Sequence, residues 1–131
     1  MTIQPIQPKV LVVEDDDVTA FLTNRVIQDS GLFAAVDWVR NGEKALERVD
    51  SHYQLIFLDL NLPVIDGATF LEFFHQRCEE GTAQPAPVVL LSSSENEELN
   101  SLLERFPMVV GKASKPLTPK ALKQAMQEAS L

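Results

Sequence analysis

Five short apolar runs divide the chain, and a helical pattern follows each of them. The runs cover residues 9–13, 34–39, 54–58, 88–91 and 108–110. Short runs rich in branched apolar residues and closed by turn residues are typical of strands buried on both faces of a parallel sheet. The fifth run is less regular, because it continues into Gly111, Lys112, Ala113 and Ser114, which are poor strand formers.

The helices between the runs are predicted from side-chain spacing and capping residues. Asp16 or Asp17 can cap the first helix, Ser94 can open a capping box with Glu97, and Thr118 with Pro119 begins the last helix. Apolar side chains at helical spacing, Val18, Phe21, Leu22 and Val26, indicate the first helix. In the third helix, Phe70, Leu71, Phe73 and Phe74 form a broad apolar face that we expect in the core.

Five strands alternating with five helices predict an α/β fold, a doubly wound parallel sheet with helices on both faces. Right-handed crossovers leave few topologies for such a chain. We expect one domain over residues 9–131, preceded by a flexible lead-in over residues 1–8, which has two prolines and no periodicity.

Composition and charge exclude several classes of function. Nineteen acidic residues against eleven Lys and Arg give a net charge of −8, which repels a phosphate backbone, so we expect no nucleic acid partner. The chain has no apolar run of membrane-spanning length and no targeting segment at its start. Its single cysteine allows no disulfide framework. These features predict a cytoplasmic protein without membrane contacts.

Carboxylates stand where two of the predicted strands end. Glu14, Asp15, Asp16 and Asp17 follow the first strand, and Asp59 follows the third. One acid suffices to cap a helix, and four crowded carboxylates repel one another unless a cation sits among them. Asp59 taken alone could simply bond to the turn that follows it. The cluster at the same sheet edge favours a functional Asp59, because ligands of open α/β sheets bind at this edge.

Ser92 and Lys115 stand at the ends of two further predicted strands. Together with the carboxylates they could bind Mg²⁺ and a phosphoryl group. Asp15 and Asp59 can supply oxygens to Mg²⁺, with Glu14 or Asp16 holding a metal-bound water. A carboxylate can attack phosphorus, and the Lys115 ammonium and the Ser92 hydroxyl can neutralise the phosphoryl oxygens. The residues therefore indicate a site for phosphoryl transfer.

In its order of motifs the chain resembles the response-regulator receiver domain from Lys9 to Ser130. Each motif is weak alone, but their succession is specific. The matching segments are Val12-Val13-Glu14-Asp15-Asp16, Leu58-Asp59-Leu60-Asn61-Leu62-Pro63 with Asp66-Gly67, Leu91-Ser92-Ser93, and Ser114-Lys115-Pro116-Leu117.

The resemblance implies the flavodoxin-like receiver fold, with strand order 2-1-3-4-5. It implies that Asp59 accepts a phosphoryl group from a sensor histidine kinase or a phosphotransfer protein. Mg²⁺ would be bound by Asp15, Asp59 and the backbone carbonyl of Asn61, with Glu14 in the second acidic position acting through a bound water. Ser92 would bond a phosphoryl oxygen, and Lys115 would pair with it.

Two residues depart from the usual pattern of the family. Many members have Asp where this chain has Glu14, whose longer side chain reaches the metal region differently. The family often has an aromatic residue three positions before the lysine, where this chain has Lys112. A cation gains little from burial beside apolar neighbours, so we expect Lys112 to stay solvated and the switch to depend on Ser92.

Two other functions fit parts of the sequence. Asp15-Asp16-Asp17-Val18-Thr19 fits the D-x-D-x-T signature of haloacid-dehalogenase-type phosphatases, with Asp15 as nucleophile and Asp17 as general acid. That family needs a further acidic pair after the lysine, and here only Glu128 follows Lys115. The other alternative is a receiver-like adaptor that works without phosphorylation.

The function that we expect is a stand-alone response regulator with Mg²⁺ as its cofactor. It would be no enzyme beyond its own phosphorylation and dephosphorylation. Its partners would be the kinase or phosphotransfer protein and a downstream protein whose identity the sequence does not reveal.

Overall fold

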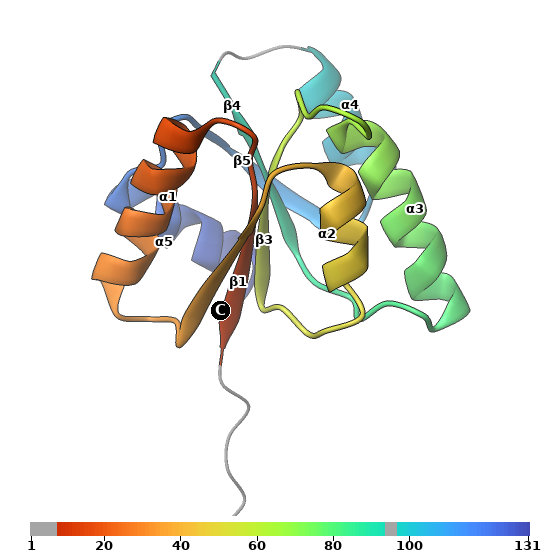
Figure 1. The fold of residues 1–131 in the computed structure, drawn as a ribbon, viewed down its shortest axis with the longest axis horizontal. Coiled ribbons are helices and arrows are strands. Elements are labelled where there is room, and N and C mark those ends of the chain that lie inside the picture. Colours follow the sequence, from red (N-terminus) through yellow and green to blue (C-terminus); the bar gives the residue numbers. More distant parts are fainter. Residues whose placement is uncertain (1–7, 94–96) are drawn as a thin grey trace, which may run out of the picture.

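The computed structural model describes residues 8–93 and 97–131, in which five strands alternate with five helices (Figure 1). Most of the predicted lead-in, residues 1–7, lies outside this part of the chain, as do residues 94–96 of the predicted capping box. The elements in order are β1 (Lys9–Val13), α1 (Asp17–Ser30), β2 (Ala35–Val39), α2 (Gly42–Arg48), β3 (Leu55–Asp59), α3 (Gly67–Glu80), β4 (Val88–Ser92), α4 (Glu97–Arg105), β5 (Val109–Ser114) and α5 (Pro119–Glu128).

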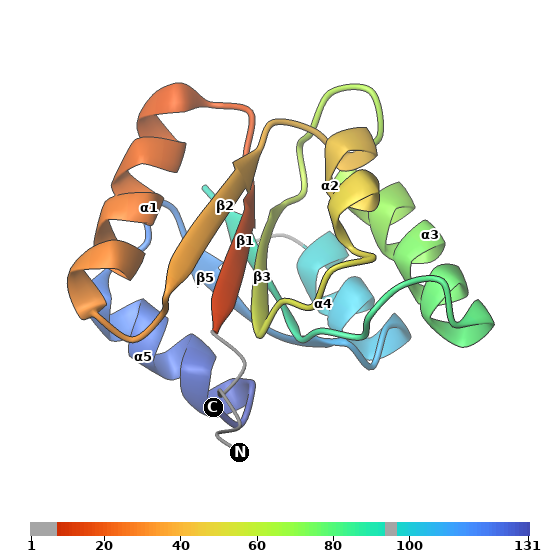
Figure 2. The same ribbon diagram turned by 60° about the horizontal axis from the view of Figure 1, so that its bottom comes forward.

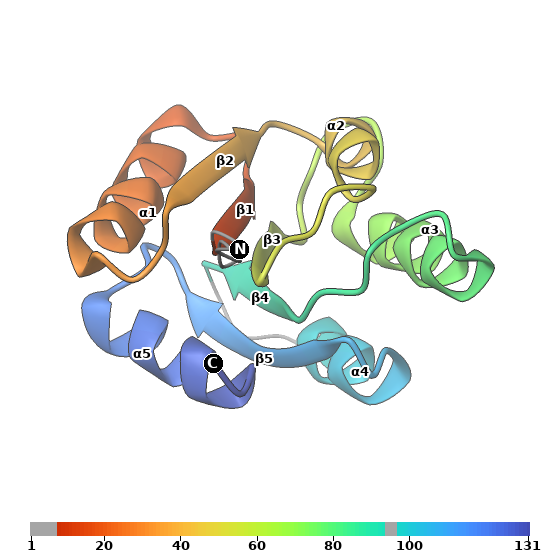
Figure 3. The ribbon, with the colours of Figure 1, turned by 90° about the horizontal axis from the view of Figure 1, so that it is seen from below.

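The strands form one parallel sheet in the order β2-β1-β3-β4-β5, which confirms the predicted fold and strand order. Helices α1 and α5 cover one face of this sheet, and α2, α3 and α4 cover the other (Figure 3). All of the strands therefore end at the same edge, so residues distant in sequence meet there. None of the helices in the described ranges is long and apolar enough to cross a membrane.

The core consists of two apolar clusters separated by the sheet. Side chains of β1 alternate between them: Val10 and Val12 pack with α1 and α5, and Leu11 and Val13 pack with α2, α3 and α4. Strands β1, β3 and β4 are almost wholly buried, since helices cover both of their faces. This burial makes the central strands a rigid base for their polar carboxyl ends.

The predicted first helix is confirmed, but most of the apolar side chains that indicate it lie at the surface. Val18 and Phe21 are 67% and 61% exposed, while Ala20 and Ile27 are fully buried. Two stripes of side chains recur at helical spacing in α1. The stripe that contains Ala20 packs on the sheet, because this small side chain allows a close approach. Spacing alone does not distinguish the two stripes.

Two further apolar side chains lie at the surface, and for one of them, Phe73, the predicted place in the core is wrong. Leu22 of α1 is 41% exposed, and Phe73 of α3 is 45% exposed, whereas Phe70, Leu71 and Phe74 are fully buried as predicted. Four apolar residues within five positions span more of the helix than one sheet can cover, so one of them remains at the surface.

Helix caps lie close to the carboxyl edge of the sheet. The Asp16 side chain caps α1 by accepting a hydrogen bond from the Thr19 amide, and Thr118 caps α5, both as predicted. Asp66 caps α3 in the same way. These caps fix where each helix begins after the loop that leaves a strand end.

Gly67 packs directly against the end of β3. Its N–H donates to the Leu60 carbonyl at 3.1 Å, and a Cβ at this position would lie 2.8 Å from Leu60 Cα and 2.9 Å from the Asp59 carbonyl oxygen. Because these neighbours are backbone atoms, they cannot rotate away. Glycine therefore lets α3 start against the residue that carries the Asp59 carboxylate.

We predict that Gly67→Ala lowers the free energy of unfolding by about 1–3 kcal/mol, the usual cost of overpacking. Alanine favours a helix more than glycine does, so a net loss would come from the clash with the β3 end. Urea unfolding measures the change, with Ser101→Ala on the exposed side of α4 as the control for adding an alanine to a helix. A variant at least as stable as the wild type would contradict the close packing.

Candidate functional site

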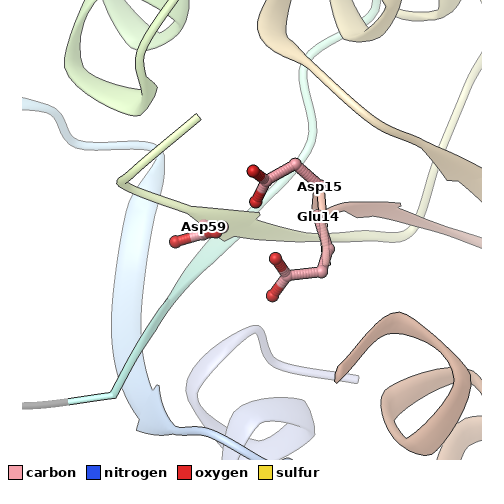
Figure 4. Close-up of side chains that lie close together, drawn as sticks. All are labelled: Glu14, Asp15 and Asp59. Carbon is pink, nitrogen blue, oxygen red and sulfur yellow. The ribbon is translucent and has the colours of Figure 1, made fainter. Parts of the chain in front are cut away.

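Three carboxylates gather where β1 and β3 end (Figure 4). Glu14 and Asp15 directly follow β1, and Asp59 is the last residue of β3. One oxygen from each of the three side chains lies within 4.8 Å of the others. Glu14 and Asp59 are buried, and Asp15 is exposed. The structure thus brings together the acids that the sequence placed at two separate strand ends.

The backbone and side chain of Glu14 are held by three neighbours. The Glu14 amide donates to the Val39 carbonyl at 3.0 Å, and the Trp38 indole Nε1 donates to the Glu14 carbonyl at 2.7 Å. The Asp16 amide donates to Glu14 Oε2 at 3.2 Å. Trp38 is not among the site residues predicted from the sequence, and its only signal is that of a polar-tipped aromatic residue near the end of an edge strand.

Lys115 joins the two buried carboxylates. Its Nζ lies 2.8 Å from Asp59 Oδ2 and 2.9 Å from Glu14 Oε1. The Lys115 amide donates to the Ser92 carbonyl at 2.9 Å, which ties the loop after β5 to the end of β4. Ion pairs inside a protein require good geometry to offset desolvation, and here one ammonium serves two acids.

The buried charges shift one another's protonation. Burial, opposed by the bond from Lys115, raises the pKa of the Glu14 carboxyl to about 7. Burial alone would lower the pKa of the Lys115 ammonium, but its bonds to Asp59 and Glu14 outweigh burial and raise that pKa. Lys115 therefore stays a cation in this pocket, where it can meet further negative charge.

The acids after Asp15 are committed to other contacts. Asp16 Oδ2 accepts from both the amide and the hydroxyl of Thr19, at 2.8 and 2.7 Å, and these bonds lower the pKa of the exposed Asp16 carboxyl. Asp17 Oδ1 pairs with Arg40 Nη1 at 2.5 Å. The structure thus leaves Glu14, rather than the capping Asp16, beside Asp59 and Lys115.

Asn61 and Ser92 lie next to Asp59. The Asn61 amide donates to Asp59 Oδ1 at 3.1 Å, so Asp59 also makes the turn contact that was its alternative role. In the sheet, Asp59 is opposite Leu91, the residue before Ser92. Ser92 is 8% exposed at the end of β4. The predicted residues therefore share one corner of the sheet edge.

The donor set has the chemistry of a site for a hard cation. Carboxylate and carbonyl oxygens are the ligands that Mg²⁺ prefers, and the exposure of Asp15 leaves one side accessible to solvent. A magnesium ion with open positions could also bind phosphate oxygens. The residues present thus fit Mg²⁺ without any sulfur or imidazole ligand.

The sequence matches the response regulator receiver domain family over residues 10–127. The probable methanogenesis regulatory protein FilR2 of Methanothrix harundinacea is 30% identical over 126 residues, which cover 91% of this chain and 79% of that protein. The protein-glutamate methylesterase/protein-glutamine glutaminase of Archaeoglobus fulgidus is 33% identical over 97 residues, but these are 73% of this chain and only 26% of the relative.

A solved structure has a similar fold. The two component response regulator from Cytophaga hutchinsonii has a TM-score of 0.83 and 26% identity, covering 95% of this chain and 97% of that one. Strand order, the acidic corner and the family match thus agree. The chain belongs to the response regulator receiver domain family.

Proposed function

We propose that this receiver is a switch controlled by phosphorylation of Asp59. A sensor histidine kinase or a phosphotransfer protein supplies the phosphoryl group from a phosphohistidine. The observation that carries this proposal is the place of the Asp59 carboxylate, 2.8 Å from Lys115 Nζ and within 4.8 Å of an oxygen of Glu14 and of Asp15.

The transfer requires a nucleophile and compensation for negative charge. An Asp59 oxygen attacks phosphorus, the bond from phosphorus to the donor imidazole breaks, and the imidazole keeps the electron pair. Lys115 is placed to neutralise one phosphoryl oxygen, and the Ser92 hydroxyl to bond another. Mg²⁺, held by Asp15, Asp59 and the Asn61 carbonyl, with Glu14 acting through water, would supply further neutralisation.

Lys115 links the chemistry to the rest of the molecule. Before phosphorylation its charge is shared by Asp59 and Glu14. A phosphoryl group brings additional charge and competes for the same ammonium, so the loop after β5 has a reason to shift. Since the Lys115 amide bonds to the Ser92 carbonyl, that shift is transmitted to the end of β4.

Lys112 stands where relatives often have an aromatic residue, and we assign it a different role. It is half-buried on β5, and its Nζ lies 3.3 Å from Asn100 Oδ1 of α4 in an exposed contact. The ammonium remains at the surface, and it adds a contact to α4 that the sequence did not predict. We therefore assign the movement to Ser92 at the end of β4.

The phosphatase alternative receives no support. The chain belongs to the receiver family, and Asp17, the proposed general acid, is paired with Arg40. The phosphorylation-independent adaptor differs from our proposal in whether Asp59 accepts phosphate. The following experiment distinguishes them.

Incubation with acetyl phosphate and Mg²⁺ should add one phosphoryl group at Asp59, because this buried carboxylate lies beside Lys115 and between the acids that could hold the metal. Intact-mass and peptide mass spectrometry measure the addition. Asp59→Asn should abolish it, and Asp50→Asn, at an exposed acid in the turn after α2, should not. Phosphate on the Asp59→Asn variant at Asp15 would revive the phosphatase, and none on the wild type would favour the adaptor.

A second experiment addresses magnesium. Glu14→Gln should weaken Mg²⁺ binding about tenfold, which is the usual effect of removing a group that orients a metal ligand. Asp15→Asn should weaken Mg²⁺ binding more, because Asp15 would bind the metal directly. The single tryptophan, Trp38, bonds to the Glu14 carbonyl, so its fluorescence can follow the titration. Asp50→Asn is again the control. Equal losses in the Glu14 and Asp15 variants would show that Glu14 binds the metal directly.

A third experiment tests the switch. Adding a phosphoryl mimic to the wild type should change amide chemical shifts at the end of β4 and the start of α4. Ser92→Ala should remove most of this response, whereas Lys112→Ala should leave it nearly intact, because the Lys112 contact with α4 lies at the surface. The reverse outcome, with the response lost only in Lys112→Ala, would reassign the switch to Lys112.

A further inference from the structure

Two exposed cations on α5 have no ion-pair partner in the described part of the chain. They are Lys120 and Lys123. Each of the other Lys and Arg side chains contacts an oxygen or an aromatic ring, as Arg25 does with Asp29 and Arg48 with Asp37. In a chain of net charge −8, unpartnered cations on one helix are an exception that needs an explanation.

Charge is also segregated along the sequence. Residues 105–131 carry a net charge of +4, and residues 1–104 carry −12. The one acid of the later stretch, Glu128, is turned inward: Oε1 accepts from Gln124 Nε2, and Oε2 is buried near Gly111, where a Cβ would overlap it. The outer side of α5 therefore presents cations without a nearby carboxylate on the same helix.

An apolar groove lies beside Lys123, between α1 and α5, and these two helices run side by side on one face of the sheet (Figure 2). Its volume is about 590 Å³, within the range of ligand-binding clefts. Leu32 and Leu131 at the groove are 53% and 47% exposed. The groove is lined mainly by Val26, Leu32, Leu122, Lys123, Met126 and Leu131.

Charge at the rim of the groove selects its occupant. The acid on the α1 side, Asp29, pairs with Arg25 at 3.4 Å, whereas Lys123 on the α5 side has no such partner among the described residues. We propose that this groove binds an acidic, amphipathic segment of a partner protein, with apolar side chains between α1 and α5 and a carboxylate at Lys123. Lys120, one turn before Lys123 on α5, adds to the local positive charge.

Other occupants match these observations less well. Residues 1–7 of this chain contain no Asp or Glu and would leave both lysines unmatched. A nucleic acid or an anionic membrane presents a long array of negative charge. Two lysines can match only a small part of this array, and the rest is repelled by the net charge of −8. A short acidic segment avoids this repulsion, because it covers only the cationic side of α5.

The test is a selection of helical 15-residue peptides from a randomised display library on the full chain. We expect selected peptides to combine Asp or Glu with apolar residues at helical spacing. Fluorescence polarisation of a selected peptide should show about tenfold weaker binding to Lys123→Glu. Lys44→Glu on α2 changes the net charge equally and should bind as the wild type does. Leu32→Gln, at an exposed position, should also weaken binding.

Several outcomes would overturn the proposal. The selection of basic or uncharged peptides would rule out an acidic partner. Equal losses of peptide affinity in Lys123→Glu and Lys44→Glu would rule it out as well. Binding that appears only after deletion of residues 1–7 would make that segment the occupant. If no peptide binds and the chain self-associates in a way that Lys123→Glu abolishes, the surface binds a second copy of the chain. If no peptide binds and Lys123→Glu abolishes binding of an oligonucleotide, the surface binds nucleic acid. The experiment uses no phosphoryl donor, so its result is independent of the chemistry of Asp59.

Discussion

The ammonium of Lys115 between the carboxylates of Glu14 and Asp59 is the contact on which the site depends. Two acids without a cation would repel each other at this buried sheet edge, and each would lose solvation. The Lys115 ammonium forms an ion pair with each of them, 2.9 Å from Glu14 Oε1 and 2.8 Å from Asp59 Oδ2. The glutamate, longer by one methylene than the aspartate common in the family, is the residue that reaches the lysine from the end of β1.

The fold makes this contact possible by placing strand ends at one edge. Burial of the central strands fixes the positions of Glu14 and Asp59, and Gly67 lets α3 begin against the end of β3. The bond from the Lys115 amide to the Ser92 carbonyl then connects β4 with the loop after β5. Buried strands thus bring Glu14 and Asp59 to the sheet edge, while Lys115 reaches them from the loop after β5.

The sequence predicted the fold and the residues of the site because both depend on local patterns. Apolar runs show buried strands, and the acid after such a run must lie at the sheet edge, as Asp59 does. It could not predict which stripe of α1 packs inward, since Ala20 and Phe21 belong to stripes of equal period. Nor could it predict that Trp38 holds the Glu14 carbonyl, because this contact depends on strand pairing. The pairing of Glu14 with Lys115 likewise depends on side-chain reach in three dimensions.

The exposed apolar side chains of α1 have a consequence for the behaviour of the protein in concentrated solution. Val18, Phe21 and Leu22 form an exposed apolar stripe on a molecule of net charge −8. Like charges keep two molecules apart at low ionic strength, but salt shortens the range of this repulsion to about 10 Å at 0.1 M. Colloidal behaviour is therefore a balance between an attractive stripe and a repulsive field. Added salt shifts this balance toward association by screening the field while leaving the apolar surface unchanged.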